Sequence, residues 1–267
     1  MQGCVNKENM KNWSIKSPEA PGFHKVIVPE NCDCKVAQMY RLNLPAGESY
    51  VLESGEMEIH PVILSGEALL SEHPVLKQTM QKYDSFYIPA ENTIKITAVK
   101  DCIFYIAGAK YEGIGQPSFR KYNPNLPYGD IHQIHGEGIY SRRVMFTLDP
   151  NTPASRLICG LTWGGNGGWT SWPPHQHEKD LEEIYCYFDM DAPKFGFHIS
   201  YLESGEIENS VIHTVQTGTV VQVPRGYHPT VASPGTINTY FWILAAFTPE
   251  SRRYDLAIAD PMFENAK

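Results

Sequence analysis

Short strand-like runs broken by turn-forming residues dominate the sequence and restrict it to an all-β class of fold. Runs rich in Val, Ile, Tyr and Phe occur at 62–64, 86–88, 94–97 and 103–107, bounded by Gly, Pro, Asn or Ser. No long stretch repeats apolar residues at the i, i+3, i+4, i+7 spacing that an amphipathic helix needs. The 21 glycines and 20 prolines among 267 residues are enough to supply frequent turns.

A change in composition divides this β-rich sequence into two halves. Residues 111–138 are rich in glycine and proline, and we interpret them as a linker. The predicted organisation is an arm at 1–35, a β-barrel at 36–110, the linker, a second β-barrel at 139–250 and a tail at 251–267.

The two halves resemble one another at three places that follow in the same order. The matched pairs are 45–49 with 167–171, 60–66 with 183–189, and 84–89 with 219–224. Three weak matches in a consistent order suggest that one small barrel was duplicated.

Charge and hydropathy argue against several classes of function. The formal net charge is −8, whereas proteins that bind nucleic acids or anionic membranes need a basic face. No apolar run approaches the roughly 18 residues of a membrane span, and the polar residues 1–20 do not resemble a secretory signal. The six cysteines, including Cys32 and Cys34, form no zinc-type pairs. We expect a cytoplasmic protein with reduced thiols, no nucleic-acid partner and no membrane.

The segment His175-Gln-His177 begins the pattern with the most chemical content. Residues two apart share one face of a strand, so both imidazoles can point to one place. Glu183 begins the next strand-like run, and His228 follows later in Pro-Arg-Gly-Tyr-His. Three imidazoles and one carboxylate suit one divalent ion (Zn, Mn, Fe, Co or Ni) and leave positions open for water or substrate.

Two neighbouring glutamates compete for the carboxylate position. Glu183 shares a strand face with Tyr185 and Tyr187, so these three side chains should point inward together. Glu182 is then expected to cap the strand or face solvent. In the N-terminal half, the positions that correspond to the four ligands hold Leu52, Ser54, His60 and Thr93. Three of these cannot bind a metal as the ligands would, so we expect a degenerate barrel there, with His60 as a structural histidine.

The wider sequence resembles a known family. The motifs His-x-His, Glu and Pro-x-Gly-x-His are similar to the metal motif of the cupin superfamily. Four segments resemble the 5-deoxy-glucuronate isomerases of inositol catabolism: 141–144, 172–177, 181–187 and 223–229. The resemblance implies a bicupin, with two jelly-roll β-barrels in tandem, and it carries the family's metal ligands onto His175, His177, Glu183 and His228. The run 195–198 resembles the related 5-keto-4-deoxyuronate isomerases, and the insert at 178–180 is shorter than in many family members.

The implied reaction is an aldose–ketose isomerisation of a sugar acid, which needs a Lewis acid, a base and a cation for the carboxylate. For the base, the sequence leaves open His198, Tyr185, Tyr187, Tyr227 and a hydroxide held by the metal. For substrate binding, the candidates are Arg142 or its neighbour Arg143, Arg225 and Trp172.

Several alternatives remain beside this hypothesis. The activity could be the uronate isomerisation of pectin breakdown, a cupin dioxygenase reaction or non-catalytic sugar binding, and a homo-oligomer is compatible with the sequence. A metal pair at His132 and His135 is disfavoured, because these residues lie in the expected linker without a carboxylate nearby. Cys32 and Cys34 are expected to remain unpaired thiols.

Overall fold

The computed structural model describes residues 5–263 and is almost entirely β-structure. The predicted all-β class is confirmed: the described residues hold one α-helix, α1 (Lys7–Met10), and four short 3-10 helices: η1 (Gly138–Tyr140), η2 (Ile207–Asn209), η3 (Pro249–Ser251) and η4 (Pro261–Phe263). Cys4, with the first residues of the expected arm, and the last four residues of the expected tail lie outside the described range. No helix within residues 5–263 is long and apolar enough to cross a membrane.

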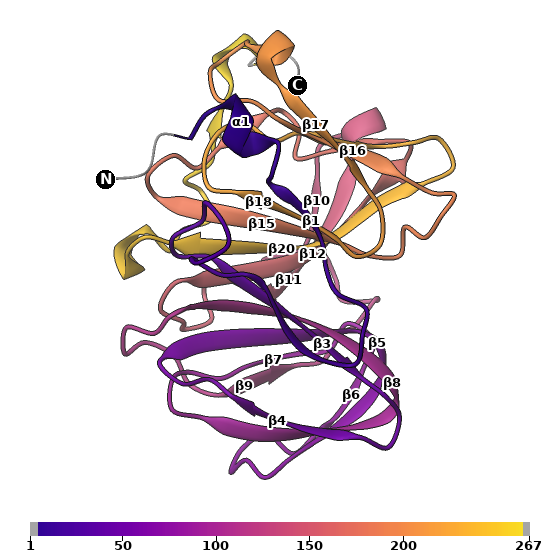
Figure 1. Cartoon of the computed structure of the whole chain (residues 1–267), viewed down its shortest axis with the longest axis vertical. Coiled ribbons are helices and arrows are strands. Elements are labelled where there is room, and N and C mark those ends of the chain that lie inside the picture. Colours follow the sequence, from indigo (N-terminus) through magenta and orange to yellow (C-terminus); the bar gives the residue numbers. More distant parts are fainter. Residues whose placement is uncertain (1–4, 264–267) are drawn as a thin grey trace.

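The N-terminal half is a single antiparallel sheet of eight strands, drawn in violet in the lower part of Figure 1. Its strands run in the order β2-β3-β8-β5-β7-β9, with β4 paired to β8 and β6 to β5. The bounds are β2 (Gly22–Ile27), β3 (Gln38–Leu44), β4 (Ser49–Glu53), β5 (Met57–Ser71), β6 (Thr79–Gln81), β7 (Ser85–Tyr87), β8 (Thr93–Lys110) and β9 (Ser118–Arg120).

The C-terminal half holds a seven-stranded sheet faced by a four-stranded one. The larger sheet runs β1 (Ser14–Lys16), β18 (Thr219–Val223), β15 (Leu181–Tyr187), β20 (Ile237–Ala246), β12 (Leu157–Asn166), β11 (Arg142–Leu148) and β10 (His132–His135). The smaller runs β13 (Trp169–Thr170), β19 (Thr230–Ala232), β16 (Gly196–Ser200) and β17 (Val211–Val215). A separate pair joins β14 (His175–Gln176) to β21 (Ile258–Ala259). Each of these sheets is open rather than closed on itself.

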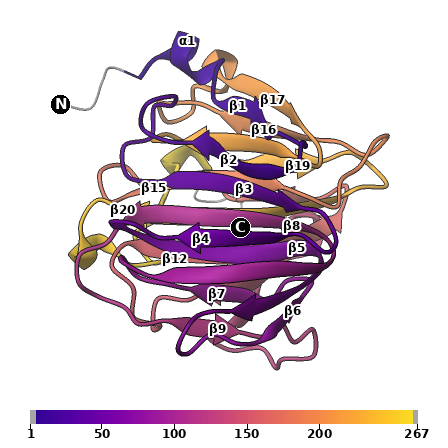
Figure 2. The same ribbon diagram turned by 60° about the horizontal axis from the view of Figure 1, so that its bottom comes forward.

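The two large sheets pack face to face across the middle of the molecule, as Figure 2 shows from a second direction. One apolar cluster there draws on both halves, for example Val62 and Tyr105 from one and Leu161 and Ile243 from the other. Two further clusters fill the interiors of the halves. Alternation along β15 explains the arrangement, since Ile184 and Cys186 belong to the interface while Tyr185 and Tyr187 point into the C-terminal half.

The N-terminal segment belongs to both halves and not to a separate arm. Strand β1 pairs with β18 of the C-terminal half, and β2 pairs with β3 of the N-terminal half. Trp13 is fully buried, and its indole N–H donates to Asp33 at 2.9 Å. The expected linker also contributes strands, because β9 and β10 pair with β7 and β11.

Two buried glutamates tie the halves together reciprocally. The Glu182 carboxylate accepts the backbone N–H groups of residues 35–37, just before β3, at 2.7–3.0 Å. The Glu58 carboxylate accepts those of residues 155–157, at the start of β12, at 2.7–2.8 Å. The expectation that Glu182 caps its strand or faces solvent is therefore wrong, since its side chain crosses the interface and is 1% exposed.

This reciprocity also corrects the alignment of the two halves. If Glu58 corresponds to Glu182, the partner of Glu183 is Ile59 and not His60. The packing agrees, because Ile59 belongs to the core of the N-terminal half, whereas His60 borders a small cavity between the halves with Thr147 and Leu148. Sequence matching was wrong by one residue, and in a strand one residue exchanges the two faces.

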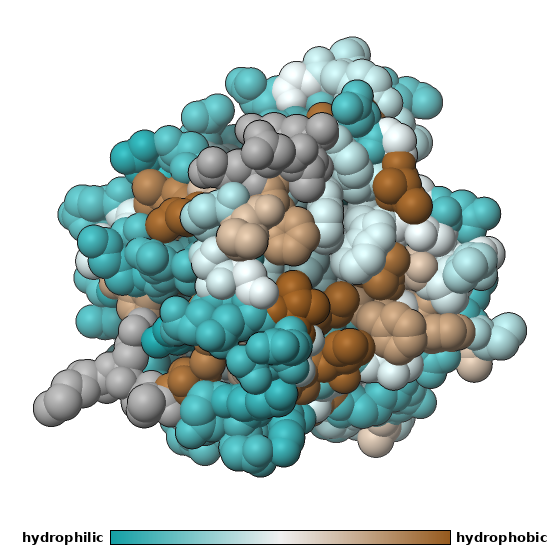
Figure 3. All heavy atoms as spheres, turned by 90° about the horizontal axis from the view of Figure 1, so that it is seen from above, coloured by the Kyte–Doolittle hydropathy of each residue, from teal (hydrophilic) through white to brown (hydrophobic). Residues whose placement is uncertain are grey.

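One face of the molecule carries a group of hydrophobic side chains. Seen from above, over the end of the C-terminal half, hydrophobic side chains gather at the middle of the face and hydrophilic ones surround them (Figure 3). The five described cysteines are free: Cys32, Cys34, Cys102, Cys159 and Cys186.

Candidate metal centre

Four side chains from separate segments of the C-terminal half converge on one point. His175 lies on β14, His177 just beyond it, Glu183 on β15, and His228 in the connection between β18 and β19. One donor atom from each of the four lies within 4.8 Å of the other three. The Glu183 Oε2 atom is 3.1 Å from His177 Nε2 and 2.9 Å from His228 Nε2. The sequence expectation placed these same four residues together.

Backbone carbonyls fix two of the imidazole rings. The Nδ1–H of His175 donates to the Pro173 carbonyl at 3.1 Å, and the Nδ1–H of His228 donates to the Gly226 carbonyl at 2.9 Å. Each ring therefore presents a bare Nε2, as histidine ligands of metals do when the other nitrogen is held by an outer hydrogen bond.

The protonation states also suit a cation. Burial raises the pKa of the Glu183 carboxyl, but the adjacent imidazoles of His177 and His228 outweigh it and leave the pKa well below its usual range. Burial lowers the pKa of His175 well below its ordinary value, and the nearby His228 and His177 add to this effect. An ionised carboxylate and neutral imidazoles are the forms that bind a metal.

Unsatisfied atoms provide a test of the fit to a metal. His228 is fully buried, yet its Nε2 makes no hydrogen bond of acceptable geometry, and neither does the Nδ1 of His177. Buried polar atoms without partners are costly, so an additional group at this place would relieve the cluster. The donor set of three nitrogens and one carboxylate fits a divalent ion. These residues could therefore hold a metal, whose identity they do not specify.

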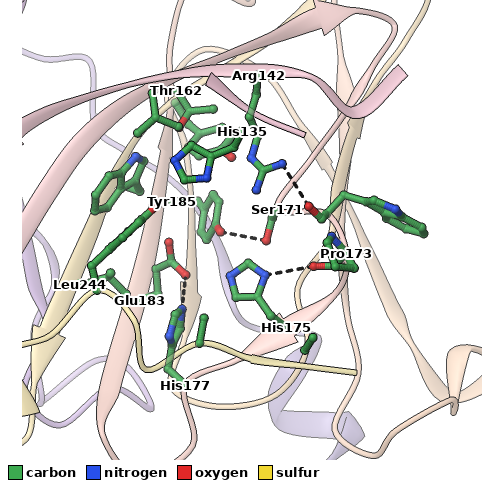
Figure 4. Close-up of a pocket in the computed structure, with 17 residues that line it drawn as sticks. His135, Arg142, Thr162, Ser171, Pro173, His175, His177, Glu183, Tyr185 and Leu244 are labelled. Atoms are coloured by element: carbon green, nitrogen blue, oxygen red, sulfur yellow. Dashed lines mark hydrogen bonds and ion pairs between the residues drawn. The ribbon is translucent and has the colours of Figure 1, made fainter. Parts of the chain in front are cut away.

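A cavity of about 250 Å³ opens beside the cluster (Figure 4). His175 and His177 lie at one side of it, and Arg142 and His135 at the other. Arg142 donates to the Trp172 carbonyl at 3.0 Å, which holds its guanidinium over the cavity. The remaining walls are largely aromatic and apolar: Val144, Thr162, Ser171, Trp172, Pro173, Glu183, Tyr185, Tyr240, Trp242, Leu244, Tyr254, Ala257 and Ala259.

The segment after residue 250, expected to be a tail, forms part of the site. Strand β21 pairs with β14, which carries His175. The backbone N–H of Asp260 donates to the Pro174 carbonyl at 2.8 Å, and its buried carboxylate accepts the hydroxyl of Tyr201 at 2.8 Å. Tyr254 from the same segment lines the cavity. A polar sequence does not reveal this, because the buried contacts are made by a few residues within it.

Among the catalytic candidates from sequence, Tyr185 alone lines the cavity, and its hydroxyl donates to Ser171 Oγ at 3.2 Å. The hydroxyl of Tyr187 forms a hydrogen bond of 2.9 Å with His198 Nδ1 deep in the core, where His198 is fully buried. Tyr227 stacks on the Tyr201 ring with centroids 5.0 Å apart. The geometry therefore separates Tyr187, Tyr227 and His198 from the cavity.

The arginine candidates also separate. Arg142 lines the cavity, whereas Arg143 faces the other way and lies 4.2 Å from the centre of the Trp163 ring. This confirms that only one of the two neighbours points inward. Arg225 lies in a different surface depression, 3.8 Å from the Glu203 carboxylate, and does not line the cavity.

An all-β fold with three histidines and one glutamate clustered inside one half defines the class of cupin-like proteins. The structure resembles an oxalate decarboxylase of Bacillus subtilis with a TM-score of 0.62 and 11% identity, covering 96% of this chain and 80% of that one. The sequence pattern of the KduI/IolB family matches residues 15–265, and the chain belongs to this family.

Curated relatives have the name 5-deoxy-glucuronate isomerase. That of Bacillus subtilis strain 168 is 27% identical over 258 residues, covering 89% of this chain and 90% of the relative. That of Lacticaseibacillus casei is 28% identical over 230 residues, covering 82% and 84%. An IolB-like protein from Salmonella typhimurium has a TM-score of 0.73 at 23% identity and covers 88% and 92%. The expectation of an enzyme of the isomerase class is confirmed.

Proposed function

We propose that this protein is a metal-dependent aldose–ketose isomerase that converts 5-deoxy-D-glucuronate to 5-dehydro-2-deoxy-D-gluconate in myo-inositol catabolism. The observation that carries the proposal is the His175, His177, Glu183 and His228 cluster at one side of a cavity with Arg142 at the other. The names of the curated relatives support the substrate. A cytoplasmic location and a homo-oligomeric state are further parts of the proposal.

The metal cluster, Arg142, Tyr185 and the aromatic walls each have a separate role in the reaction. A divalent metal, when bound by the cluster, would act as a Lewis acid on the oxygens of the carbonyl and neighbouring hydroxyl. Arg142 would bind the distant carboxylate, because its remaining N–H groups have no carboxylate partner among the described residues. Tyr185 donates a hydrogen bond rather than acting as base, since burial and the charge of Glu183 raise its pKa well above the ordinary value. The aromatic walls exclude water from the intermediate.

We also infer that the halves are tandem jelly-roll barrels of a bicupin, with a degenerate barrel at 36–110 and the metal-binding barrel at 139–250. The reciprocal clamps of Glu58 and Glu182 support a duplication, because each carboxylate binds the same backbone position of the opposite half. The N-terminal unit has lost the ligands, with Ile59 where the other has Glu183.

The alternative substrate is the 5-keto-4-deoxyuronate of pectin breakdown, whose isomerases the run 195–198 resembles. The deciding experiment is metal analysis of the purified protein together with turnover assays on both uronates. We expect about one divalent metal per chain and turnover of 5-deoxy-glucuronate, both lost in His177→Ala, which should remain folded because the apolar core does not depend on the site.

Three outcomes would contradict this proposal. Preference for the pectin-derived uronate would transfer the assignment to the other activity. Metal-dependent oxygen consumption without isomerisation would indicate a dioxygenase. Full turnover by His177→Ala would refute the metal centre itself.

A further inference from the structure

Isomerisation through an enediolate needs a base that reaches the substrate carbon, and the cavity offers few. Among the described lining residues, the groups that ordinarily titrate near neutrality or below are His135 and three members of the metal cluster: His175, His177 and Glu183. The lining tyrosines are unsuitable, since burial raises the pKa of Tyr240 to about 12 and the pKa values of Tyr185 and Tyr254 well above the ordinary value. His135 is therefore the one lining base outside the cluster.

Strand pairing explains why His135 faces the cavity. On β10, His135 pairs with Arg142 and Gln133 with Val144, and both of these β11 residues line the cavity. Figure 4 shows the His135 ring beside Arg142, across the cavity from His177. His132 lies three positions away and so faces the opposite side, where its Nδ1–H donates to the Leu126 carbonyl at 2.6 Å. The two histidines thus do not form a metal pair.

A chain of hydrogen bonds sets the tautomer of His135. The side-chain amide of Gln133 donates to the Asp130 carbonyl at 3.0 Å, which turns its Oε1 toward the imidazole. That oxygen accepts the Nε2–H of His135 at 2.6 Å. The Nδ1 atom is left as the basic nitrogen, because the side-chain hydrogen bond of His135 among residues 5–263 is made through Nε2. A base oriented by a second group through its other nitrogen is a recurrent arrangement in catalysis.

The surroundings keep this ring neutral. Burial lowers the pKa of His135, and the positive charge of Arg142 on β11 lowers it further. From the C-terminal segment, the titratable group that faces it is Tyr254, whose ring centre lies 6.3 Å away. No carboxylate forms an ion pair with His135 in the described part of the chain.

We propose that His135 is the catalytic base that transfers the proton between the two carbons of the substrate, with Gln133 as its positioning residue. This inference rests on the proposed isomerase function and names the group that performs its central step. The sequence leaves open four residues and a hydroxide held by the metal. The fold places three of those residues outside the cavity, and burial makes the fourth, Tyr185, a poor base.

The step balances without any other reactant. The Nδ1 atom of His135 takes the proton from the hydroxyl-bearing carbon, and the C–H electron pair forms the C=C bond of an enediolate as the carbonyl oxygen gains negative charge. The hydroxyl proton passes to that oxygen. His135 then returns its proton to the former carbonyl carbon, while the other oxygen becomes the new carbonyl. Arg142 would keep the distant carboxylate of the substrate bound during both transfers.

The test compares His135→Gln and His135→Asn with His132→Gln, a matched control on the same strand but the opposite face. Turnover of the metal-loaded enzymes and deuterium uptake from D₂O are measured on whichever uronate the wild type isomerises. We expect kcat to fall about 100-fold or more in both His135 variants, as for loss of a general base, with metal content unchanged and deuterium uptake lost in proportion. The control should stay within about threefold of wild type. A smaller loss in the His135 variants would overturn the assignment.

A second readout does not depend on the substrate. In ¹⁵N–¹H spectra of the histidine side chains, His135 should be protonated on Nε2 and bare on Nδ1, and Gln133→Leu should mix the two tautomers and lower kcat about tenfold. A His135 protonated on Nδ1 would refute the role even if the wild type acts on neither uronate. Inactivity of the wild type on both, in contrast, refutes the proposed function.

Discussion

Single substitutions of two adjacent glutamates should have different effects: one should lower the stability of the fold, and the other should weaken metal binding. Glu182 and Glu183 follow one another on β15, but Glu182 binds the backbone of residues 35–37 and Glu183 lies in the metal cluster. We therefore compare Glu182→Gln with Glu183→Gln, two changes of equal size and charge.

The geometry gives the magnitude for Glu182→Gln. The Oε2 atom accepts all three N–H groups and Oε1 shares that of Lys35, so an amide nitrogen in either place faces a donor. One or two charge-assisted hydrogen bonds are then lost, at about 1.5–3 kcal/mol each. We expect the free energy of unfolding to fall by about 2–4 kcal/mol, which corresponds to a melting temperature lower by roughly 5–10 °C.

Calorimetry and metal analysis of both variants provide the assay. Glu182→Gln should have a lower melting temperature than wild type but keep its metal. Glu183→Gln without metal should have nearly the melting temperature of metal-free wild type, and it should bind metal poorly. Glu58→Gln is the matched variant of the reciprocal clamp and should lose similar stability. Loss of metal from Glu182→Gln with an unchanged melting temperature would refute the assignment of the two carboxylates.

Two further predictions concern the cavity. Arg142→Gln should raise KM for the uronate about 30-fold or more, as expected for about 2 kcal/mol of lost charged hydrogen bonding. The side chain of Arg143 stacks on Trp163, so Arg143→Gln should leave KM within about twofold. Equal effects on KM would contradict the inward orientation of Arg142. Because burial, His228 and His177 lower the pKa of His175, this ligand stays neutral as the pH falls below the ordinary histidine value of about 6.5. Metal should therefore be retained in dialysis at about pH 6 and released only under more acidic conditions, and half-release at or above pH 6.5 would count against this reasoning.

Local patterns predicted which side chains come together in the C-terminal half. Period-two spacing placed His175 and His177 together and distinguished the inward Glu183 from its neighbour, because strand alternation depends on nothing beyond the strand itself. The same rule predicted that one of Arg142 and Arg143 faces inward. It did not show which inward-facing residues reach the cavity, and for that reason Tyr187 and His198 were candidates although they lie deep in the core.

His135 and Tyr254 show what local patterns miss. Each lies in a polar or glycine-rich stretch, the expected linker and the expected tail, where no strand signal marks a buried face. Both line the cavity because β10 adds to the edge of the seven-stranded sheet and β21 pairs with β14. The pairing of β14 with β21 joins residues far apart in the sequence, whereas β10 and β11 are neighbours along the chain. In both cases the backbone hydrogen bonds between the strands carry no side-chain signature.

Residue type and spacing along single strands are enough to predict the all-β class and the four residues that cluster in the C-terminal half. The packing of the two halves, in contrast, is needed to see that Glu182 binds the opposite half, that Arg225 lies outside the cavity, and that His135 lines it. The physical reason is that a strand fixes the face of each side chain, whereas the neighbour that this face meets is set by packing between distant segments.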